Sequence, residues 1–165
     1  MDFESLTHDI FDHVTVETFS MKAVTEWVIK EYLPQFQKGE QTVELKPPKD
    51  ASMSMDKSMY IQILHNIFSN AIKYAGTGAK ILITYEKSDT EYTLIFADNG
   101  RGIPEKEMAF VKEKFYRVDK ARTGQDKSMG IGLSIIDRIA RLHRGTLSIE
   151  KNSPKGVKVI VKIGR

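Results

Sequence analysis

Residues 92–104 read YTLIFADNGRGIP, an apolar run that ends in a carboxylate and two glycines. Asp-Asn-Gly is typical of a hairpin turn, which predicts a second strand directly afterwards. Instead a proline follows, and Met108, Val111 and Phe115 then recur at helical spacing. The stretch therefore predicts a strand, a glycine loop and a helix. This arrangement brings Asp98 to a strand end beside bare backbone, which suits a flat ligand.

The composition predicts one soluble domain with a real core. The chain has 165 residues, of which 41% are hydrophobic, and it has no cysteine, which excludes disulfides and thiolate chemistry. No apolar run approaches the roughly 18–20 residues of a membrane span, and no signal peptide is evident. The net charge is +3, but the basic residues are scattered, so we expect no nucleic-acid partner.

Outside this stretch, helical and strand patterns alternate along the chain. Residues 1–17 are interpreted as the tail of something larger, running into the short link VTVETF. A helix over 21–36 is expected after an N-cap at Ser20, with Val24, Trp27, Val28 and Phe36 on one side and Pro34 bending or ending it. The other expected helices cover 57–75 and 130–145, and the expected strands cover 41–46, 51–55, 79–87, 91–98, 145–152 and 156–163. Such strands, joined mainly antiparallel, with amphipathic helices over one face, predict a two-layer α/β (α+β) sandwich with a mixed sheet.

One polar stripe follows the helix over 57–75. Asn66, Asn70, Lys73 and Tyr74 lie at i, i+4, i+7 and i+8, opposite the apolar side. The stripe fits an ordinary solvated face. It also fits a magnesium nucleotide, because an amide oxygen can bind Mg²⁺ and a lysine can offset phosphate charge.

A second candidate is the Gly130-Ile-Gly132 segment, which is expected to open a helix. Free amides there would make an anion site, although a flexible helix entry explains the glycines equally well. No dinucleotide fingerprint and no P-loop is present. His8 and His13 lack the convergent ligands that a metal site needs.

Four motifs occur in order: HNIFSNAIKYA (65–75), DNGRGIP (98–104), EKFYRVDKAR (113–122) and SMGIGLSI (128–135). Together they resemble the asparagine, first glycine, phenylalanine and second glycine boxes of the catalytic and ATP-binding domain of bacterial sensor histidine kinases. The resemblance covers about residues 16–165 and implies the Bergerat-type fold that these two-component kinases share with gyrase and MutL.

The resemblance implies roles for the matching residues. Asp98 would accept a hydrogen bond from the adenine amino group of ATP, while Gly100 and Gly102 would let the base lie against backbone. Asn70 would be the Mg²⁺ ligand, with Asn66 beside the phosphates. The other implied nucleotide contacts are Lys73, Tyr74, Ile103, Phe115, Gly130, Ile131, Gly132 and Leu133.

The resemblance also implies a catalytic set. Residues 113–129 would form a lid over ATP, anchored by Phe115. Arg117, Arg122 and Gln125 would reach the terminal phosphate and stabilise charge during transfer. Related ATPases carry a water-activating glutamate where this chain has Asn66; because an amide cannot take a proton from water, we expect slow hydrolysis.

Two features depart from the family. Ser128 stands where a glycine is usual, and no phosphoacceptor box is present, since the segment at His8 lacks the Arg/Lys-x-Pro that should follow. We therefore interpret residues 1–15 as the end of a dimerisation helix and residues 16–165 as the catalytic domain. Such a fragment would be a cytoplasmic monomer from a homodimeric, membrane-anchored parent.

Its partners would be the acceptor histidine of the parent's dimerisation domain and a cognate response regulator. Two alternatives remain open at this stage. One is an anti-sigma-factor-type serine kinase, which shares these boxes. The other is a nucleotide-sensing interaction module without catalysis, which Ser128 leaves open.

Overall fold

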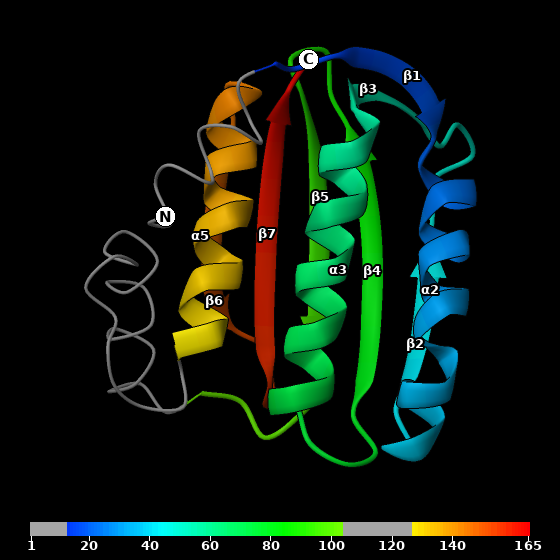
Figure 1. Cartoon of the computed structure of the whole chain (residues 1–165), viewed down its shortest axis with the longest axis vertical. Helices are drawn as coiled ribbons and strands as arrows, with labels where there is room; N and C mark the ends of the chain where they lie inside the picture. Colours follow the sequence, from blue (N-terminus) through cyan, green and yellow to red (C-terminus); the bar gives the residue numbers. More distant parts are fainter. Residues whose placement is uncertain (1–12, 104–126) are drawn as a thin grey trace.

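The computed structural model describes residues 13–103 and 127–165 of the chain (Figure 1). The elements in these ranges are β1 (Val16–Ser20), α2 (Met21–Lys38), β2 (Thr42–Lys46), β3 (Ser52–Asp56), α3 (Lys57–Tyr74), β4 (Lys80–Lys87), β5 (Glu91–Asp98), α5 (Lys127–Leu142), β6 (Thr146–Lys151) and β7 (Val157–Gly164). The helix expected over 105–115 lies outside the described residues.

A five-stranded sheet forms one layer, in the order β2-β4-β5-β7-β6. β2 pairs with β4 in parallel, and the other three pairings are antiparallel. The helices α2, α3 and α5 lie side by side over one face of this sheet (Figure 1). The predicted two-layer sandwich with a mixed, mainly antiparallel sheet is therefore confirmed.

Alternation along the strands explains why one face is covered. In β4, Ile81, Ile83 and Tyr85 are buried, while the residues between them are less so. In β5, the buried side chains are Tyr92, Leu94 and Phe96. Because successive side chains point to opposite faces, each strand contributes every second residue to the core beneath the helices.

α3 crosses the middle of the covered face. It begins after Asp56, whose side chain accepts a hydrogen bond from the Met59 backbone N–H and so caps the helix. Its buried residues are Met59, Tyr60, Ile63, Leu64, Ile67, Phe68 and Ala71. This confirms a two-faced helix, at the edges of which Ile61 and Ile72 are partly buried.

The apolar side of α2 differs from the expectation at one large residue. Val24, Val28 and Phe36 are buried as predicted, but Trp27 is 56% exposed. Thr25 is buried instead, and its hydroxyl lies 2.6 Å from the buried Tyr60 hydroxyl. At about 100° per residue, Trp27 lies about 60° beyond Val24, outside the arc that the buried residues cover. Pro34 lies inside the helix and does not end it.

The segment interpreted as a link contains a strand. β1 pairs antiparallel with β3, and the two form a separate small sheet. Short strands with mixed polarity, such as Val16–Ser20, give a weak periodic signal, so the pairing was not predicted. Phe19 of β1 packs against Tyr60 of α3, with ring centroids 5.6 Å apart.

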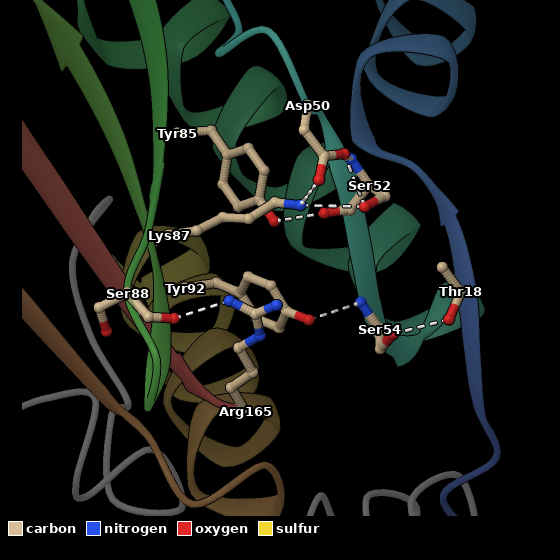
Figure 2. Close-up of polar contacts among 9 residues, drawn as sticks. All are labelled: Thr18, Asp50, Ser52, Ser54, Tyr85, Lys87, Ser88, Tyr92 and Arg165. Carbon is tan, nitrogen blue, oxygen red and sulfur yellow. Dashed lines mark hydrogen bonds and ion pairs between the residues drawn. The ribbon is translucent and has the colours of Figure 1, made fainter.

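Polar side chains tie this small sheet to the main one (Figure 2). Lys87 Nζ, at the end of β4, lies 2.8 Å from the Asp50 carboxylate and 2.9 Å from Ser52 Oγ. The Tyr85 hydroxyl donates to the Ser52 carbonyl at 2.8 Å. The hydrogen bonds from Lys87 and Ser52 hold the pKa of Asp50 well below its usual range. The two sheets are thus joined by side chains rather than by a shared ladder.

Candidate functional site

A mostly apolar pocket is enclosed by α3, α5, the sheet and the loop after β5. Its lining residues are Ile67, Asn70, Ala71, Tyr74, Ala75, Ile81, Phe96, Asp98, Gly102, Ile103, Leu133, Ile149, Val157 and Val159. Polar side chains come only from Asn70, Tyr74 and Asp98 among these residues. Such a pocket, with a few polar groups that fix orientation, is typical of a small-molecule site.

Asp98, the last residue of β5, supplies the carboxylate of the pocket. Its Oδ1 accepts hydrogen bonds from the backbone N–H groups of Gly100, at 2.9 Å, and Val157, at 3.3 Å. Oδ2 takes no hydrogen bond from any residue in the described ranges. Burial raises the pKa of Asp98, and the two backbone hydrogen bonds oppose that rise. The free oxygen can therefore select a ligand that donates a hydrogen bond.

The turn between β6 and β7 holds the end of β5 in place. Asn152 Nδ2 donates to the Asp98 carbonyl at 2.9 Å. Gly156 has φ +105°, and a Cβ there would collide with the same Asp98 carbonyl. Since both contacts act on the backbone of Asp98, they fix where its carboxylate lies.

The two glycines of the loop have different roles. A Cβ on Gly100 would collide with the carbonyl of Ala75, at the end of α3, and the Arg101 backbone N–H donates to that carbonyl at 3.1 Å. Gly100 is thus required for close contact with α3, and its expected contact with the base stays a prediction. Gly102 has φ +75° and lines the pocket, as expected.

The polar stripe of α3 faces α5. A Cβ on Gly132 would lie 3.1 Å from Asn66 Oδ1 and 3.5 Å from Asn70 Nδ2, so the bare backbone of α5 packs directly against both amides. Asn66 Nδ2 donates to the Gln62 carbonyl at 2.9 Å. Both asparagines are partly buried, so this part of the stripe is not an ordinary solvated face.

The remaining residues of the expected site divide into two groups. Tyr74, Ile103 and Leu133 line the pocket together with Asn70 and Asp98. Lys73, by contrast, is exposed and does not line it. The structure therefore brings the base-binding part of the expected site together more completely than the phosphate-binding part.

The start of α5 differs from the expectation. The helix begins at Lys127, so Gly130 and Ile131 lie within it and Gly132 is in its second turn, rather than at its entry. Only the first four backbone N–H groups of a helix lack an internal partner, so Gly132 has no free amide to offer an anion. Gly132 instead serves the close contact with α3. Lys127–Met129, expected in the lid, are also helical.

Several expected residues cannot be placed. Phe115, Arg117, Arg122 and Gln125 lie outside the described residues, as does the lid from 113 to 126. Their roles stay predictions.

The apolar walls of the pocket were not predicted as ligand contacts. They come from α3 and from the covered face of the sheet, through Ile81, Phe96, Ile149, Val157 and Val159. Alternation in the strands identifies this face, but it does not show which part of the face the helices leave open.

Among the described residues, no group of three or more His, Cys, Asp or Glu side chains could hold a metal ion. None of the helices described here is both long enough and apolar enough to cross a membrane.

Known proteins resemble this chain in sequence. The family described as histidine kinase-, DNA gyrase B-, and HSP90-like ATPase matches residues 55–165. Sensor protein CiaH of Streptococcus pneumoniae is 36% identical over 108 residues, which are 66% of this chain and 24% of CiaH. Sensor histidine kinase WalK of Bacillus subtilis is 34% identical over 115 residues, which are 68% of this chain and 19% of WalK. The chain thus spans about a quarter or less of these relatives.

Solved structures share the fold. The catalytic domain of histidine kinase ThkA superposes with a TM-score of 0.76 at 24% identity, covering 91% of this chain and 95% of that one. Histidine kinase AdeS of Acinetobacter baumannii gives 0.75 at 25% identity, covering 97% and 72%. The resemblance drawn from the four motifs is confirmed. Because the family match includes more than half of the chain and both asparagines and Asp98 of the site, the chain belongs to the histidine kinase-, DNA gyrase B-, and HSP90-like ATPases.

Proposed function

We propose that this chain is the ATP-binding catalytic domain of a sensor histidine kinase. It would bind Mg-ATP and transfer the γ-phosphoryl group to a histidine of the parent's dimerisation domain. The observation that carries the proposal is the free Oδ2 of Asp98 in an apolar pocket whose other wall bears Asn70. The names of CiaH and WalK as sensor proteins support it.

The base would occupy the apolar part of the pocket. An adenine ring presents an amino group that donates, and Asp98 Oδ2 can accept that hydrogen bond without losing its backbone partners. A guanine ring carries an oxygen at the same position, which would face the carboxylate unfavourably. The site thus favours ATP over GTP.

The asparagines fit a magnesium ion held mainly by phosphate oxygens and water, which needs only one or two protein ligands. Asn70 lines the pocket, and its side chain makes no hydrogen bond to another described residue. Asn70 would hold the ion, with Asn66 beside the phosphates. The ion would supply positive charge that offsets the triphosphate.

Phosphoryl transfer would break the bond between the γ-phosphorus of ATP and the β–γ bridging oxygen, which leaves with ADP. A new bond would form between the γ-phosphorus and a nitrogen of the acceptor histidine. Asn66 has no proton-accepting side chain at neutral pH, so water would not be activated there. Arg117, Arg122 and Gln125 would stabilise charge on the transferred group, and Phe115 would anchor the lid. Transfer would depend on how the acceptor histidine is positioned.

The proposed partners follow from the same assignment. ThkA has been solved in complex with the response regulator TrrA, which supports a response regulator as the downstream partner. The parent would be a homodimer anchored in a membrane with this domain in the cytoplasm. Residues 1–15 would be the end of its dimerisation helix, and residues 16–165 the catalytic domain.

Calorimetric titration with Mg-ATP tests the nucleotide assignment. In Asp98→Asn, Oδ1 keeps both backbone hydrogen bonds, so the new amide nitrogen replaces Oδ2 and turns a donor toward the amino group. We expect affinity to fall by about tenfold or more. The matched control is Asp89→Asn in the exposed turn after β4, which should bind as the unaltered chain does. Equal affinities in both variants would contradict the assignment.

Asn70→Ala tests the metal site. We expect it to lower affinity for ATP when Mg²⁺ is present and to have little effect when Mg²⁺ is replaced by a chelator. The same loss under both conditions would show that Asn70 contacts the nucleotide without a metal.

Transfer is tested with labelled Mg-ATP and a separately made dimerisation domain of the parent. We expect acid-labile label on that domain, and Arg122→Ala should slow labelling more than it weakens ATP binding. ATP binding with no label on a histidine-bearing partner would favour a nucleotide-sensing module instead.

A further inference from the structure

The end of α3 is fixed by two side chains from outside the helix, and neither belongs to the expected site. One is Gln41, which directly precedes β2 and is only 6% exposed. The other is Arg101, in the loop after Asp98. Both donate hydrogen bonds to carbonyl groups in the last turn of α3 or just beyond it.

Gln41 uses both protons of its amide for this purpose. Nε2 donates to the Ala71 carbonyl at 3.1 Å and to the Gly76 carbonyl at 2.9 Å. Its Oε1 is buried and has no hydrogen-bond partner in the described part of the chain. A buried acceptor without a partner costs free energy, so the amide is a poor choice for stability alone.

The two carbonyls do not depend on Gln41 for satisfaction. Ala71 also accepts from the Ala75 N–H at 3.0 Å, and Gly76 also accepts from the Ala79 N–H at 3.3 Å. Removing the Gln41 amide therefore leaves no backbone carbonyl unpaired there. What the amide adds is a fixed position for residues 71–76 relative to β2.

That position matters because the loop after β5 rests on it. Gly100 packs against the Ala75 carbonyl, and the Arg101 backbone N–H donates to it at 3.1 Å. Arg101 Nε donates to the Tyr74 carbonyl at 2.9 Å, which joins the loop to the helix a second time. Gly100 in turn donates to Asp98 Oδ1. A displacement at Ala75 is thus passed on to the carboxylate.

We propose that Gln41 and Arg101 are positioning residues for the nucleotide base: they hold the end of α3 where the loop, and through it Asp98, must lie. The inference rests on the proposed ATP function and assigns a cause to its base selectivity. Neither residue lines the pocket, so they act through Ala75 and Gly100 and not by contact with the ligand.

The test compares ATP and GTP affinities by competition with a fluorescent nucleotide, with folding monitored by thermal denaturation. Gln41→Met keeps the length of the side chain but removes both donors, so we expect near-normal stability and a reduced preference for ATP over GTP, by about fivefold. Gln41→Glu places a carboxylate against two carbonyls, and we expect a larger loss of the preference for ATP over GTP.

An exposed glutamine provides the control for the Gln41→Glu variant. Gln37→Glu makes the same charge change on the exposed side of α2 and should leave the nucleotide preference unchanged.

Arg101→Ala is the second test variant. Because Arg101 is exposed, the variant should fold normally and show a reduced preference for ATP over GTP, and Arg101→Lys should restore part of that preference. Arg101→Ala keeps the inference testable if a Gln41 variant does not fold.

The outcomes separate the two proposals. No ATP binding by the unaltered chain would overturn the proposed function, and this inference with it. ATP binding with an unchanged ATP-to-GTP ratio in Gln41→Met and Arg101→Ala would overturn the inference alone. A uniform loss for both nucleotides, matched by a loss of stability, would likewise reduce the two residues to a structural role.

Discussion

At the scale of single residues, Asp98 combines two opposing demands. The pocket needs an ionised carboxylate as an acceptor, but burial raises the pKa of Asp98 and so disfavours that form in the folded chain. A carboxyl group whose pKa is raised on folding contributes stability at low pH, and this contribution is lost as pH rises through the folded-state pKa. The unliganded protein therefore carries a cost at neutral pH for its binding residue.

Asp98→Asn should reveal this cost. We expect the variant without nucleotide to be at least as stable as the unaltered chain at pH 7, because its amide carries no charge to desolvate. The difference should shrink toward acidic pH, where Asp98 is protonated in both the folded and the unfolded states. Urea denaturation between pH 3 and 7 measures it, and a variant that is markedly less stable at pH 7 would contradict the assigned cause.

Gly100 is the second residue whose identity the structure explains. Gly100→Ala should destabilise the protein by about 1–3 kcal/mol, because the new methyl group meets the Ala75 carbonyl. It should also weaken ATP binding at temperatures where the variant is folded. Urea denaturation and calorimetry measure the two effects.

Gly78→Ala is the control for Gly100→Ala, because it introduces backbone strain without a steric collision. Gly78 has φ +80° and open space around its Cβ position, so alanine there meets only backbone strain of about 1–2 kcal/mol. Its ATP affinity should stay normal. If Gly100→Ala also bound ATP normally, the contact with Ala75 would have no part in forming the pocket.

At the scale of elements, α3 and α5 are joined at both ends. Near the pocket, Gly132 packs on Asn66 and Asn70. At the other end, His143 Nδ1 donates to the Ile139 carbonyl at 2.8 Å, and its Nε2 accepts from the Asp56 backbone N–H at 3.1 Å. The imidazole thus links the end of α5 to the start of α3.

His143→Leu should destabilise the protein by about 1–3 kcal/mol, because it leaves the buried N–H of Asp56 without this acceptor. The measurement is urea denaturation at pH 7. Arg138→Ala, at an exposed position of α5, is the control and should change stability by less than about 0.5 kcal/mol. Similar values for both variants would show that the link carries little energy.

At the scale of the whole molecule, most of the described helices and strands of the two-layer sandwich contribute residues to the pocket. Its walls come from two helices, four strands and one loop of the described residues, so ligand binding and global folding are coupled. A ligand that binds only the folded state must raise the free energy of unfolding.

Mg-ATP at about 100 times its dissociation constant should therefore stabilise the chain by about 2.7 kcal/mol. Thermal denaturation should show a higher midpoint with Mg-ATP than with Mg-GTP at the same concentration. An equal rise with both nucleotides would mean that the triphosphate, and not the base, supplies the binding energy.

Much of the fold was predictable because it rests on local patterns. Strand alternation predicted the strands of the main sheet, and helical periodicity, with the cap at Ser20, predicted the starts of α2 and α3. β1 was missed because a short strand of mixed polarity has little periodic signal of its own. Trp27 was misplaced because the buried side of α2 includes Thr25, whose hydroxyl partner lies 35 residues away.

The sequence by itself determined the motifs, the two-faced helix and the carboxylate at a strand end, because these depend on residue type and spacing along the chain. Only the tertiary structure decided that Gly100 faces Ala75, that Gly132 covers the asparagines and that Gln41 secures the end of α3. The physical reason is that these contacts join segments far apart in the chain. Their geometry is set by how the helices pack on the sheet, which no local pattern contains.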